Sequence, residues 1–201
     1  MQVFTMPEKL FTSVPRIGNI IPLKELTLLT GLAGTGKSYS LIKFLNQHNI
    51  TPLYFNLDED ATIKQELNVF QGDPNWIKDI LDLTVVDLKD EVVVIDTYQQ
   101  LTSLLSSEGN TLKYQEWLTA ALTKVARTCE CAVIVIGHPE DYVGKDSIFK
   151  DNPSMVRNAY EHLHLDSILP RGKTKSDIVY RMFIKKGRGI GGTTMIDNWM
   201  R

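Results

Sequence analysis

Residues 26–38, LTLLTGLAGTGKS, decide the fold class of this chain. Leu26–Thr30 is a short apolar run of the kind that forms a buried strand, and Gly31–Ser38 follows the pattern G-x-x-x-x-G-K-[S/T]. The segment from about Gly36 to Gln47 then has the pattern of a helix. In such a strand–loop–helix unit the backbone N–H groups of the loop point inward at phosphate oxygens, and the helix adds its positive end. The sequence therefore predicts a phosphate-binding loop.

The side chains of this loop have distinct expected tasks. Lys37 would reach the β- and γ-phosphates of a nucleotide, and the Ser38 hydroxyl would bind Mg²⁺, which prefers oxygen ligands. The alternative is a chance glycine-rich turn, which the flanking strand and helix disfavour. The residues predicted to contact the nucleotide are Gly31, Ala33, Gly34, Thr35, Gly36, Lys37, Ser38 and Tyr39.

A second strand carries an acidic residue at its end. Four consecutive apolar residues, Val92–Ile95, are typical of a strand buried on both faces, and Asp96 follows them. A carboxylate at this place can hold the metal of a bound nucleotide. An ordinary strand-ending aspartate is the alternative. Together with the phosphate-binding loop, however, Asp96 predicts the binding of a nucleotide with Mg²⁺, with Ser38 and Asp96 as the metal-binding residues.

Apolar segments and helical patterns alternate along the whole chain, which is typical of an α/β fold with a mostly parallel sheet flanked by helices. We expect residues 1–201 to form a single domain that ends in an antiparallel hairpin. Besides the elements named above, the expected strands are Pro52–Leu57, Ala132–Ile136, Ile178–Ile184 and Thr193–Ile196, and the expected helices are Ala61–Phe70 and Thr111–Thr128.

Composition excludes several classes of protein. The chain has 201 residues, 43% of them hydrophobic and 23% charged, and its net charge of −2 gives no general attraction to nucleic acid or anionic membranes. Its apolar runs are far shorter than the roughly 20 residues that cross a bilayer. The N-terminus does not have the pattern of a signal peptide, so we expect a cytoplasmic protein without a membrane partner. Cys129 and Cys131 suit neither a disulfide framework nor a zinc site, and we interpret them as packing residues.

Hydrolysis of a nucleotide also needs a group that polarises the attacking water, usually a carboxylate. The acidic cluster Asp58–Asp60 directly follows the expected strand Pro52–Leu57. In the alternative interpretation these acids are the solvated first turn of a helix, where negative side chains are favoured. A catalytic acid in this cluster is the preferred interpretation.

These motifs, in this order, resemble the RecA-like ATPase superfamily. The resemblance rests on the phosphate-binding loop, the strand-then-acid segment Tyr54–Glu59, the strand ending at Asp96 and the strand that ends Ile136-Gly137-His138. Within the superfamily the chain looks most like the motor domains of ring-shaped replicative helicases, of the DnaB and phage primase-helicase types, and like small phage ATPases and recombinases. The resemblance covers nearly the whole chain.

The resemblance implies roles for further residues. The glutamate that activates water in ring helicases corresponds to Asp58, which is one methylene shorter, so either Asp58 or the adjacent Glu59 is implied as the base. His138 matches the polar residue that senses the γ-phosphate. Arg188, with Lys186 as its helper, matches the segment that reaches into the nucleotide site of the neighbouring subunit. A guanidinium suits that task because its fixed fork of donors spreads over the transferring phosphoryl group. A basic hairpin turn is the alternative.

By resemblance, the expected function is an oligomeric ATPase, as a hexameric ring or a filament, that acts on single-stranded DNA or RNA. The segments 103–111 and 139–153 match the loops that line the central channel of such rings, although their basic residues are few. The alternatives are a nucleotide-dependent assembly or regulatory module with slow hydrolysis and a small-molecule kinase. His162 and His164 share one face of an expected strand and are interpreted as structural.

Overall fold

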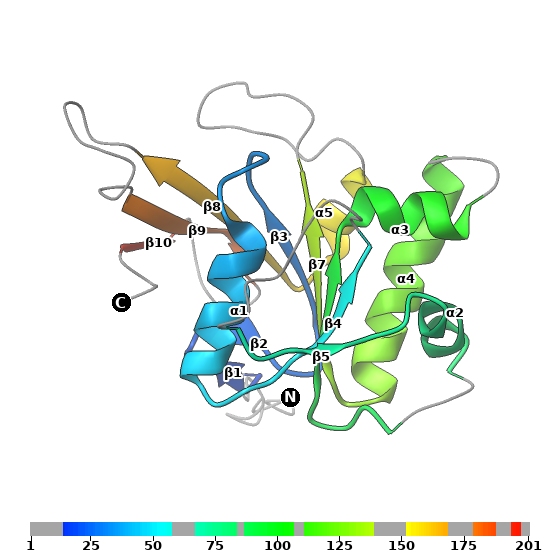
Figure 1. The fold of residues 1–201 in the computed structure, drawn as a ribbon. Coiled ribbons are helices and arrows are strands. Elements are labelled where there is room, and N and C mark those ends of the chain that lie inside the picture. Colours follow the sequence, from blue (N-terminus) through cyan, green and yellow to red (C-terminus); the bar gives the residue numbers. More distant parts are fainter. Residues whose placement is uncertain are drawn as a thin grey trace, which may run out of the picture.

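The computed structural model describes residues 14–57, 67–83, 87–106, 111–138, 152–168, 179–187 and 194–197. Strands alternate with helices along the chain, as the α/β interpretation requires (Figure 1). The elements are β1 (Arg16–Ile17), β2 (Ile21–Pro22), β3 (Leu26–Thr30), α1 (Lys37–Gln47), β4 (Leu53–Asn56), β5 (Phe70–Gln71), α2 (Trp76–Leu81), β6 (Val92–Asp96), α3 (Tyr98–Leu105), α4 (Leu112–Thr128), β7 (Ala132–Gly137), α5 (Pro153–Asn158), β8 (Glu161–Ile168), β9 (Val179–Gly187) and β10 (Thr194–Asp197).

The described strands form one main sheet in the order β10-β9-β8-β3-β7-β6-β4-β5, and β1 and β2 form a separate small hairpin. The six strands from β8 to β5 in this order are parallel to one another, whereas β9 pairs antiparallel with β8, and β10 pairs antiparallel with β9. Parallel neighbours need crossover connections, which the helices supply. The predicted fold class is confirmed: an α/β fold with a mostly parallel sheet and an antiparallel C-terminal pair of strands.

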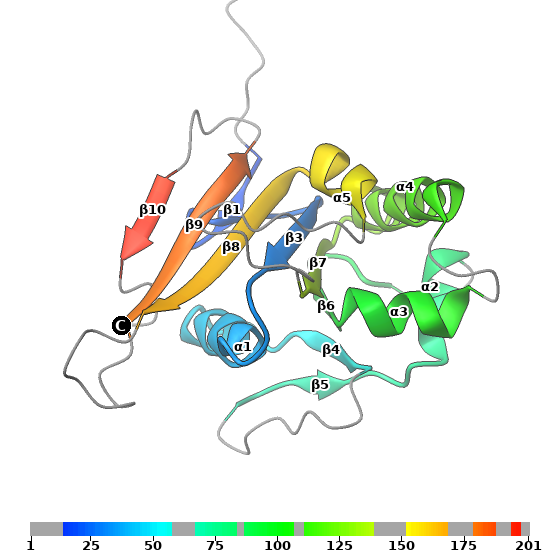
Figure 2. The same ribbon diagram turned by 90° about the horizontal axis from the view of Figure 1, so that it is seen from above.

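Helices cover both faces of the sheet (Figure 2). Leu28 and Leu29 are neighbours in β3, both fully buried, and they belong to opposite hydrophobic clusters because successive side chains of a strand point to opposite faces. On one face Leu41 of α1 packs in the cluster of Leu29, and on the other Leu118 of α4 packs in the cluster of Leu28. Burial on both faces explains why the central strands are continuous apolar runs.

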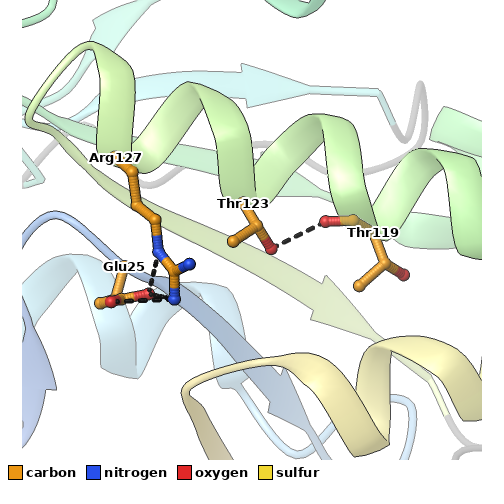
Figure 3. Close-up of polar contacts among 4 residues, drawn as sticks. All are labelled: Glu25, Thr119, Thr123 and Arg127. Atoms are coloured by element: carbon orange, nitrogen blue, oxygen red, sulfur yellow. Dashed lines mark hydrogen bonds and ion pairs between the residues drawn. The ribbon is translucent and has the colours of Figure 1, made fainter.

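The C-terminal end of α4 is tied to the start of β3 (Figure 3). The Arg127 guanidinium donates to both carboxylate oxygens of Glu25, the residue before β3, with a shortest distance of 3.0 Å. One turn earlier, the Thr123 hydroxyl donates to the Thr119 carbonyl at 2.8 Å. Half-exposed ion pairs of this kind contribute about 0–1 kcal/mol to the free energy of unfolding, so this contact is a minor part of what stabilises α4 against the sheet.

The predicted helix Ala61–Phe70 is wrong over its last residues. Residues 61–66 lie outside the described part of the chain, but residues 67–69 are not helical and Phe70 begins the edge strand β5. The Phe70 N–H donates to the Pro52 carbonyl at 2.9 Å, and the Gly72 N–H donates to the Tyr54 carbonyl at 2.9 Å. Pairing with β4 therefore takes up the backbone hydrogen bonds that a helix would satisfy internally.

The helices α2, α3 and α5 were not predicted, and two of them shorten the loops expected to contact a polymer. Within the segment 103–111, residues 103–105 are the last turn of α3. Thr111 is the N-cap of α4, and its side chain accepts from the Tyr114 N–H. Within the segment 139–153, Pro153 is the first residue of α5. The rest of the two segments lies largely outside the described residues, which lack 107–110 and 139–151.

Within the described residues, no helix has the length and apolar character to cross a membrane. Cys131 is fully buried, and Cys129 packs against the same hydrophobic cluster. Burial raises the pKa of the Cys131 thiol to about 12. Both side chains therefore contribute apolar packing at the turn between α4 and β7.

Candidate nucleotide-binding site

The phosphate-binding loop connects β3 to α1 at the carboxyl ends of the parallel strands (Figure 1). Gly34 and Gly36 have positive φ angles of 75° and 76°, the left-handed conformation that glycine adopts without strain. The loop is closed internally by Thr35, whose N–H and hydroxyl both donate to the Leu32 carbonyl, at 3.2 and 2.8 Å. Gly36 is the N-cap of α1, so the N–H groups of the first helical turn, which a helix does not satisfy internally, border the loop.

Two further loop residues differ in accessibility. Ala33 is exposed at the tip of the loop, next to the exposed Gly34. Tyr39 lies in the first turn of α1 and is partly exposed, with the Lys43 ammonium 5.9 Å from the centre of its ring. The predicted nucleotide-contacting residues therefore lie in the loop itself or in the first turn of α1. They are Gly31, Ala33, Gly34, Thr35, Gly36 and Tyr39.

Lys37 places a buried cation against the loop. Its Nζ donates to the carbonyls of Gly31 and Leu32, both at 2.8 Å, and the residue is only 3% exposed. Burial lowers the pKa of Lys37 to about 8, and the negative charge of Asp96 opposes this effect. A lysine in this position can exchange its carbonyl partners for phosphate oxygens without moving far from the loop.

Ser38 and Asp96 form the candidate metal-binding pair. Asp96 ends β6 and is 3% exposed, and its Oδ2 accepts a hydrogen bond from the Ser38 hydroxyl. The buried Tyr54 hydroxyl, from β4, donates to the same oxygen at 2.6 Å. A hydroxyl and a carboxylate are oxygen donors of the kind that Mg²⁺ accepts while it keeps several waters and phosphate oxygens as its other ligands. The donor set at this point therefore fits the metal of a bound nucleotide.

His138 follows β7 beside the loop. Thr30 and Gly137 are paired in the sheet, so His138 lies level with the start of the phosphate-binding loop. Gln99 of α3 holds its backbone from two sides: Gln99 Nε2 donates to the His138 carbonyl at 2.8 Å, and the His138 N–H donates to Gln99 Oε1 at 3.4 Å. The end of β7 is thereby connected to α3, the helix that starts directly after Asp96.

His162 and His164 support the loop from the neighbouring strand. They lie on one face of β8, as predicted, and both have a ring nitrogen 2.9 Å from the Thr30 hydroxyl oxygen. Thr30 is the residue before Gly31. Among the described residues no group of three or more His, Cys, Asp or Glu side chains is arranged for a metal ion. The two hydrogen bonds to Thr30 connect the histidines of β8 to β3.

The remaining predicted residues lie partly outside the described chain. Leu57, the residue after β4, donates its N–H to the Asp96 carbonyl at 2.7 Å, and Asp58 and Glu59, which follow it, are not described. Arg188 lies outside the described residues as well. Lys186 belongs to β9 and is paired with His162 in β8, but its side chain is not described. Of the predicted site residues, the structure therefore describes those of the loop and the start of α1, Asp96, His138 and the backbone of Lys186.

Tyr54 and Gln99 are site residues that the sequence analysis did not single out as functional. Each one reaches a predicted residue that is distant in sequence, 42 positions away for Tyr54 and 39 for Gln99. The pairing of β4 with β6, which sets Asn56 opposite Asp96, is what brings the Tyr54 hydroxyl to the carboxylate. Only the order of the strands could have indicated these contacts.

A scan against models of protein families finds no match for this chain, and neither does a comparison with curated proteins. Solved structures do match. A DnaB-like replicative helicase, whose structure was described together with its interactions with primase, aligns with a TM-score of 0.60 at 14% identity, over 87% of this chain and 54% of that one. The RadB recombinase aligns with a TM-score of 0.59 at 15% identity, over 88% of this chain and 87% of that one.

This chain has the fold of the RecA-like ATPases. The flagellar accessory protein FlaH from Methanocaldococcus jannaschii shares it as well, with a TM-score of 0.56 at 16% identity, over 90% of this chain and 88% of that one. The chain spans about half the length of the DnaB-like helicase chain, 54%. These solved structures come from proteins with different tasks, and what they share with this chain is the predicted fold.

Proposed function

We propose that this chain is a Mg²⁺-dependent ATPase that acts as an oligomer and couples ATP hydrolysis to binding of, or movement along, single-stranded nucleic acid. One observation carries the ATPase part: Lys37, Ser38 and Asp96 meet at one end of the sheet, with Ser38 hydrogen-bonded to Asp96. The RecA-like fold supports it. We further propose that residues 1–201 form one RecA-like domain.

Each of these side chains has a defined task in the proposed reaction. Gly31, Gly34 and Gly36 let the loop amides surround the phosphates, and Lys37 donates to the β- and γ-phosphates. Ser38 and Asp96 would hold Mg²⁺, which neutralises negative charge on the phosphates when it is bound. Asp58 or Glu59 would orient the attacking water and accept its proton. This division of tasks relies on positioning and electrostatics, the usual basis of phosphoryl-transfer catalysis.

His138 is proposed to sense the γ-phosphate. Its backbone is held by Gln99, and α3 begins directly after Asp96, so a change at the phosphate would be transmitted to both segments that follow. In the proposed motor these segments, 103–111 and 139–153, contact the single strand, with the first of them shortened by the last turn of α3. Phosphate contacts by a ring of subunits would make polymer binding dependent on salt.

The site is proposed to be completed by a neighbouring subunit. Arg188, assisted by Lys186, would reach the nucleotide of the next subunit in a hexameric ring or in a filament. Both arrangements use a head-to-tail interface, which closes into a ring or continues as a filament according to its rotation. A monomer would then hydrolyse ATP poorly because it lacks part of its site.

A second function has support of its own. A nucleotide-dependent assembly module with slow hydrolysis is favoured by the similarity to FlaH, an accessory protein whose TM-score of 0.56 is close to that of the helicase. Aspartate at position 58 also favours the assembly module, because the resemblance implies a glutamate as the base at this position. Slow turnover that no polymer stimulates would identify this function.

The test is steady-state ATPase activity at several protein concentrations, with and without single-stranded DNA and RNA. Lys37→Ala serves as the inactive control, and Arg188→Ala is mixed in increasing fractions into the wild type. We expect turnover per subunit to rise with protein concentration and with one of the polymers, and small fractions of Arg188→Ala to inhibit more than in proportion. Turnover that neither the polymers nor the mixed subunits change would refute the motor and leave the assembly module.

A further inference from the structure

Tyr54 is a buried polar residue to which none of the tasks above is assigned. It lies in the middle of β4 and is fully buried, in the hydrophobic cluster that the sheet forms with α1. Its hydroxyl donates to Asp96 Oδ2 at 2.6 Å, a short bond of the kind that forms between a neutral donor and a carboxylate. The phenol of Tyr54 therefore ends at the carboxylate proposed to bind the metal.

Asp96 depends on its hydrogen bonds for its orientation. The terminal torsion of an aspartate is broad, so the carboxylate plane is not fixed by its own rotamer. Among the described residues, the hydrogen bonds to this carboxylate come from Ser38 and Tyr54, and both end on Oδ2. Ser38 is itself proposed to bind the metal, which leaves Tyr54 as the donor with no other task.

We infer that Tyr54 is a positioning residue: its hydroxyl fixes the Asp96 carboxylate through Oδ2 and so leaves Oδ1 as the oxygen that faces the hydrated metal. This inference rests on the proposed function. The tyrosine suits the task because its ring is packed on all sides and has few ways to move, which makes its hydroxyl a fixed point. It also joins β4, which leads to Asp58 and Glu59, to the end of β6.

The alternative is that the Asp96 carboxylate merely satisfies a buried hydroxyl and that Tyr54 stabilises the core. The two roles differ in what the substitution Tyr54→Phe changes. Phenylalanine keeps the ring and loses only the hydroxyl, so a packing role predicts a change in stability alone. A positioning role predicts weaker metal binding in the presence of nucleotide, at unchanged affinity for nucleotide without metal.

The test measures Mn²⁺, as a spectroscopic substitute for Mg²⁺, by electron paramagnetic resonance in the presence of saturating ADP. Tyr54→Phe should weaken Mn²⁺ binding by about 10- to 100-fold, as is typical for partners that orient a metal ligand. The affinity for ADP in the presence of a chelator should stay within about twofold. Tyr98→Phe is the matched control because Tyr98 is equally buried but packs in the cluster on the other face of the sheet, and its Mn²⁺ affinity should equal that of the wild type.

A double-mutant cycle with Asp96→Ala tests whether Tyr54 acts through the carboxylate. Once Asp96 is truncated, Tyr54→Phe should cause no further loss of Mn²⁺ affinity. An unchanged Mn²⁺ affinity in Tyr54→Phe, or an equal loss with and without Asp96, would overturn the inference while leaving the proposed function in place. If the wild type binds no Mn²⁺ with ADP, the proposed function fails and the inference fails with it.

A second measurement does not depend on the folding of the Tyr54 variant. In a chain with Tyr39→Phe and Tyr98→Phe, which remove the tyrosine next to the phosphate-binding loop and the control tyrosine that is as buried as Tyr54, the remaining tyrosines carry ¹³C at Cζ, the atom bonded to the hydroxyl. Addition of Mg²⁺ to the ADP complex should move the resonance of a buried tyrosine, because the acceptor of its proton becomes polarised. Spectra in which no tyrosine resonance moves would overturn the inference.

Discussion

Gly31 and Gly34 belong to the same loop but are required for different reasons. A Cβ on Gly31 would lie 2.4 Å from the backbone oxygen of Leu165 in β8, which cannot move without shifting the strand. At Gly34 the space is open, and the obstacle is the φ of +75°, which costs a non-glycine residue about 1–2 kcal/mol. The first glycine is thus fixed by packing and the second by backbone conformation.

We therefore expect Gly31→Ala to abolish nucleotide binding and to lower the free energy of unfolding by more than Gly34→Ala does. For Gly34→Ala the loss of stability should be about 1 kcal/mol. Urea denaturation and titration with a fluorescent ADP analogue measure the two effects. Equal losses for both variants would show that Leu165 yields to the added methyl group.

The sequence was sufficient to predict positions that depend on local spacing, but not the contacts that side chains make across the sheet. Lys37 and Ser38 begin α1 directly after the loop, and their places follow from the spacing of the glycines. Tyr54 looked like one more apolar strand residue, because nothing near it in the sequence indicates that its hydroxyl reaches Asp96. Gln99 was missed for the same reason.

Among the elements, α4 offers a direct test of which face is buried. Leu118 is fully buried against the sheet, whereas the adjacent Trp117 is 49% exposed and packs beside Tyr114 on the surface. Leu118→Ala should lower the free energy of unfolding by about 2–5 kcal/mol, the usual cost of truncating a buried leucine. Trp117→Ala should cost less than about 1 kcal/mol although it removes more atoms. Chemical denaturation compares them, and a larger loss for Trp117→Ala would mean that its face of α4 is covered in solution.

The contact between α3 and β7 leads to a prediction about the proposed reaction. Gln99→Leu removes both hydrogen bonds to the His138 backbone while keeping a side chain of similar size. We expect nucleotide affinity to stay within about threefold and the rate of ATP hydrolysis to fall about 10-fold or more, because His138 is no longer held at the phosphate. Single-turnover hydrolysis and nucleotide titration separate the two. A variant that keeps its full rate would show that His138 needs no support from α3.

Continuous apolar strands and long amphipathic helices were predictable, and the short helices were not. The runs Val92–Ile95 and Ala132–Ile136 became β6 and β7, because only a strand buried on both faces needs so many consecutive apolar residues. α3 and α5 are only eight and six residues long. Their signals lie in their caps: the side chains of Thr97 and Asn152 accept from the backbone of the following turn, and Pro153 occupies the first position of α5.

At the scale of the whole molecule, the N-terminal hairpin is attached at the end of the sheet opposite to the nucleotide site. Arg16 of β1 donates to Glu161 at the start of β8 at 2.9 Å and to the Ile20 carbonyl at 2.7 Å. Glu161 is paired with Thr27, at the start of β3, whereas the phosphate-binding loop follows the other end of that strand. Arg16→Ala should therefore destabilise the fold by about 3–5 kcal/mol, since it leaves a buried carboxylate without its cation. Nucleotide affinity, measured on the folded variant, should not change.

Substitution of the other partner, Glu161→Gln, should have an effect that depends on pH. Burial raises the pKa of Glu161 above its usual value of 4.5, although Arg16 opposes this, and no described group donates to its Oε1. Because the folded state then holds the proton more tightly than the unfolded state, the contribution of Glu161 to the free energy of unfolding falls as the pH rises from 4.5 through the raised pKa. Glutamine cannot ionise and avoids this loss.

Relative to the wild type, Glu161→Gln should therefore gain stability between pH 4.5 and pH 7.5, opposite in sign to the effect of Arg16→Ala at neutral pH. Urea denaturation of the three proteins at both pH values measures the difference, with pH 4.5 as the condition in which the Glu161 carboxyl is more protonated than at pH 7.5. A difference between Glu161→Gln and the wild type that is the same at both pH values would mean that the carboxyl does not titrate with a raised pKa. The ion pair would then hold the hairpin by net attraction, and the glutamine variant would be the less stable one at neutral pH.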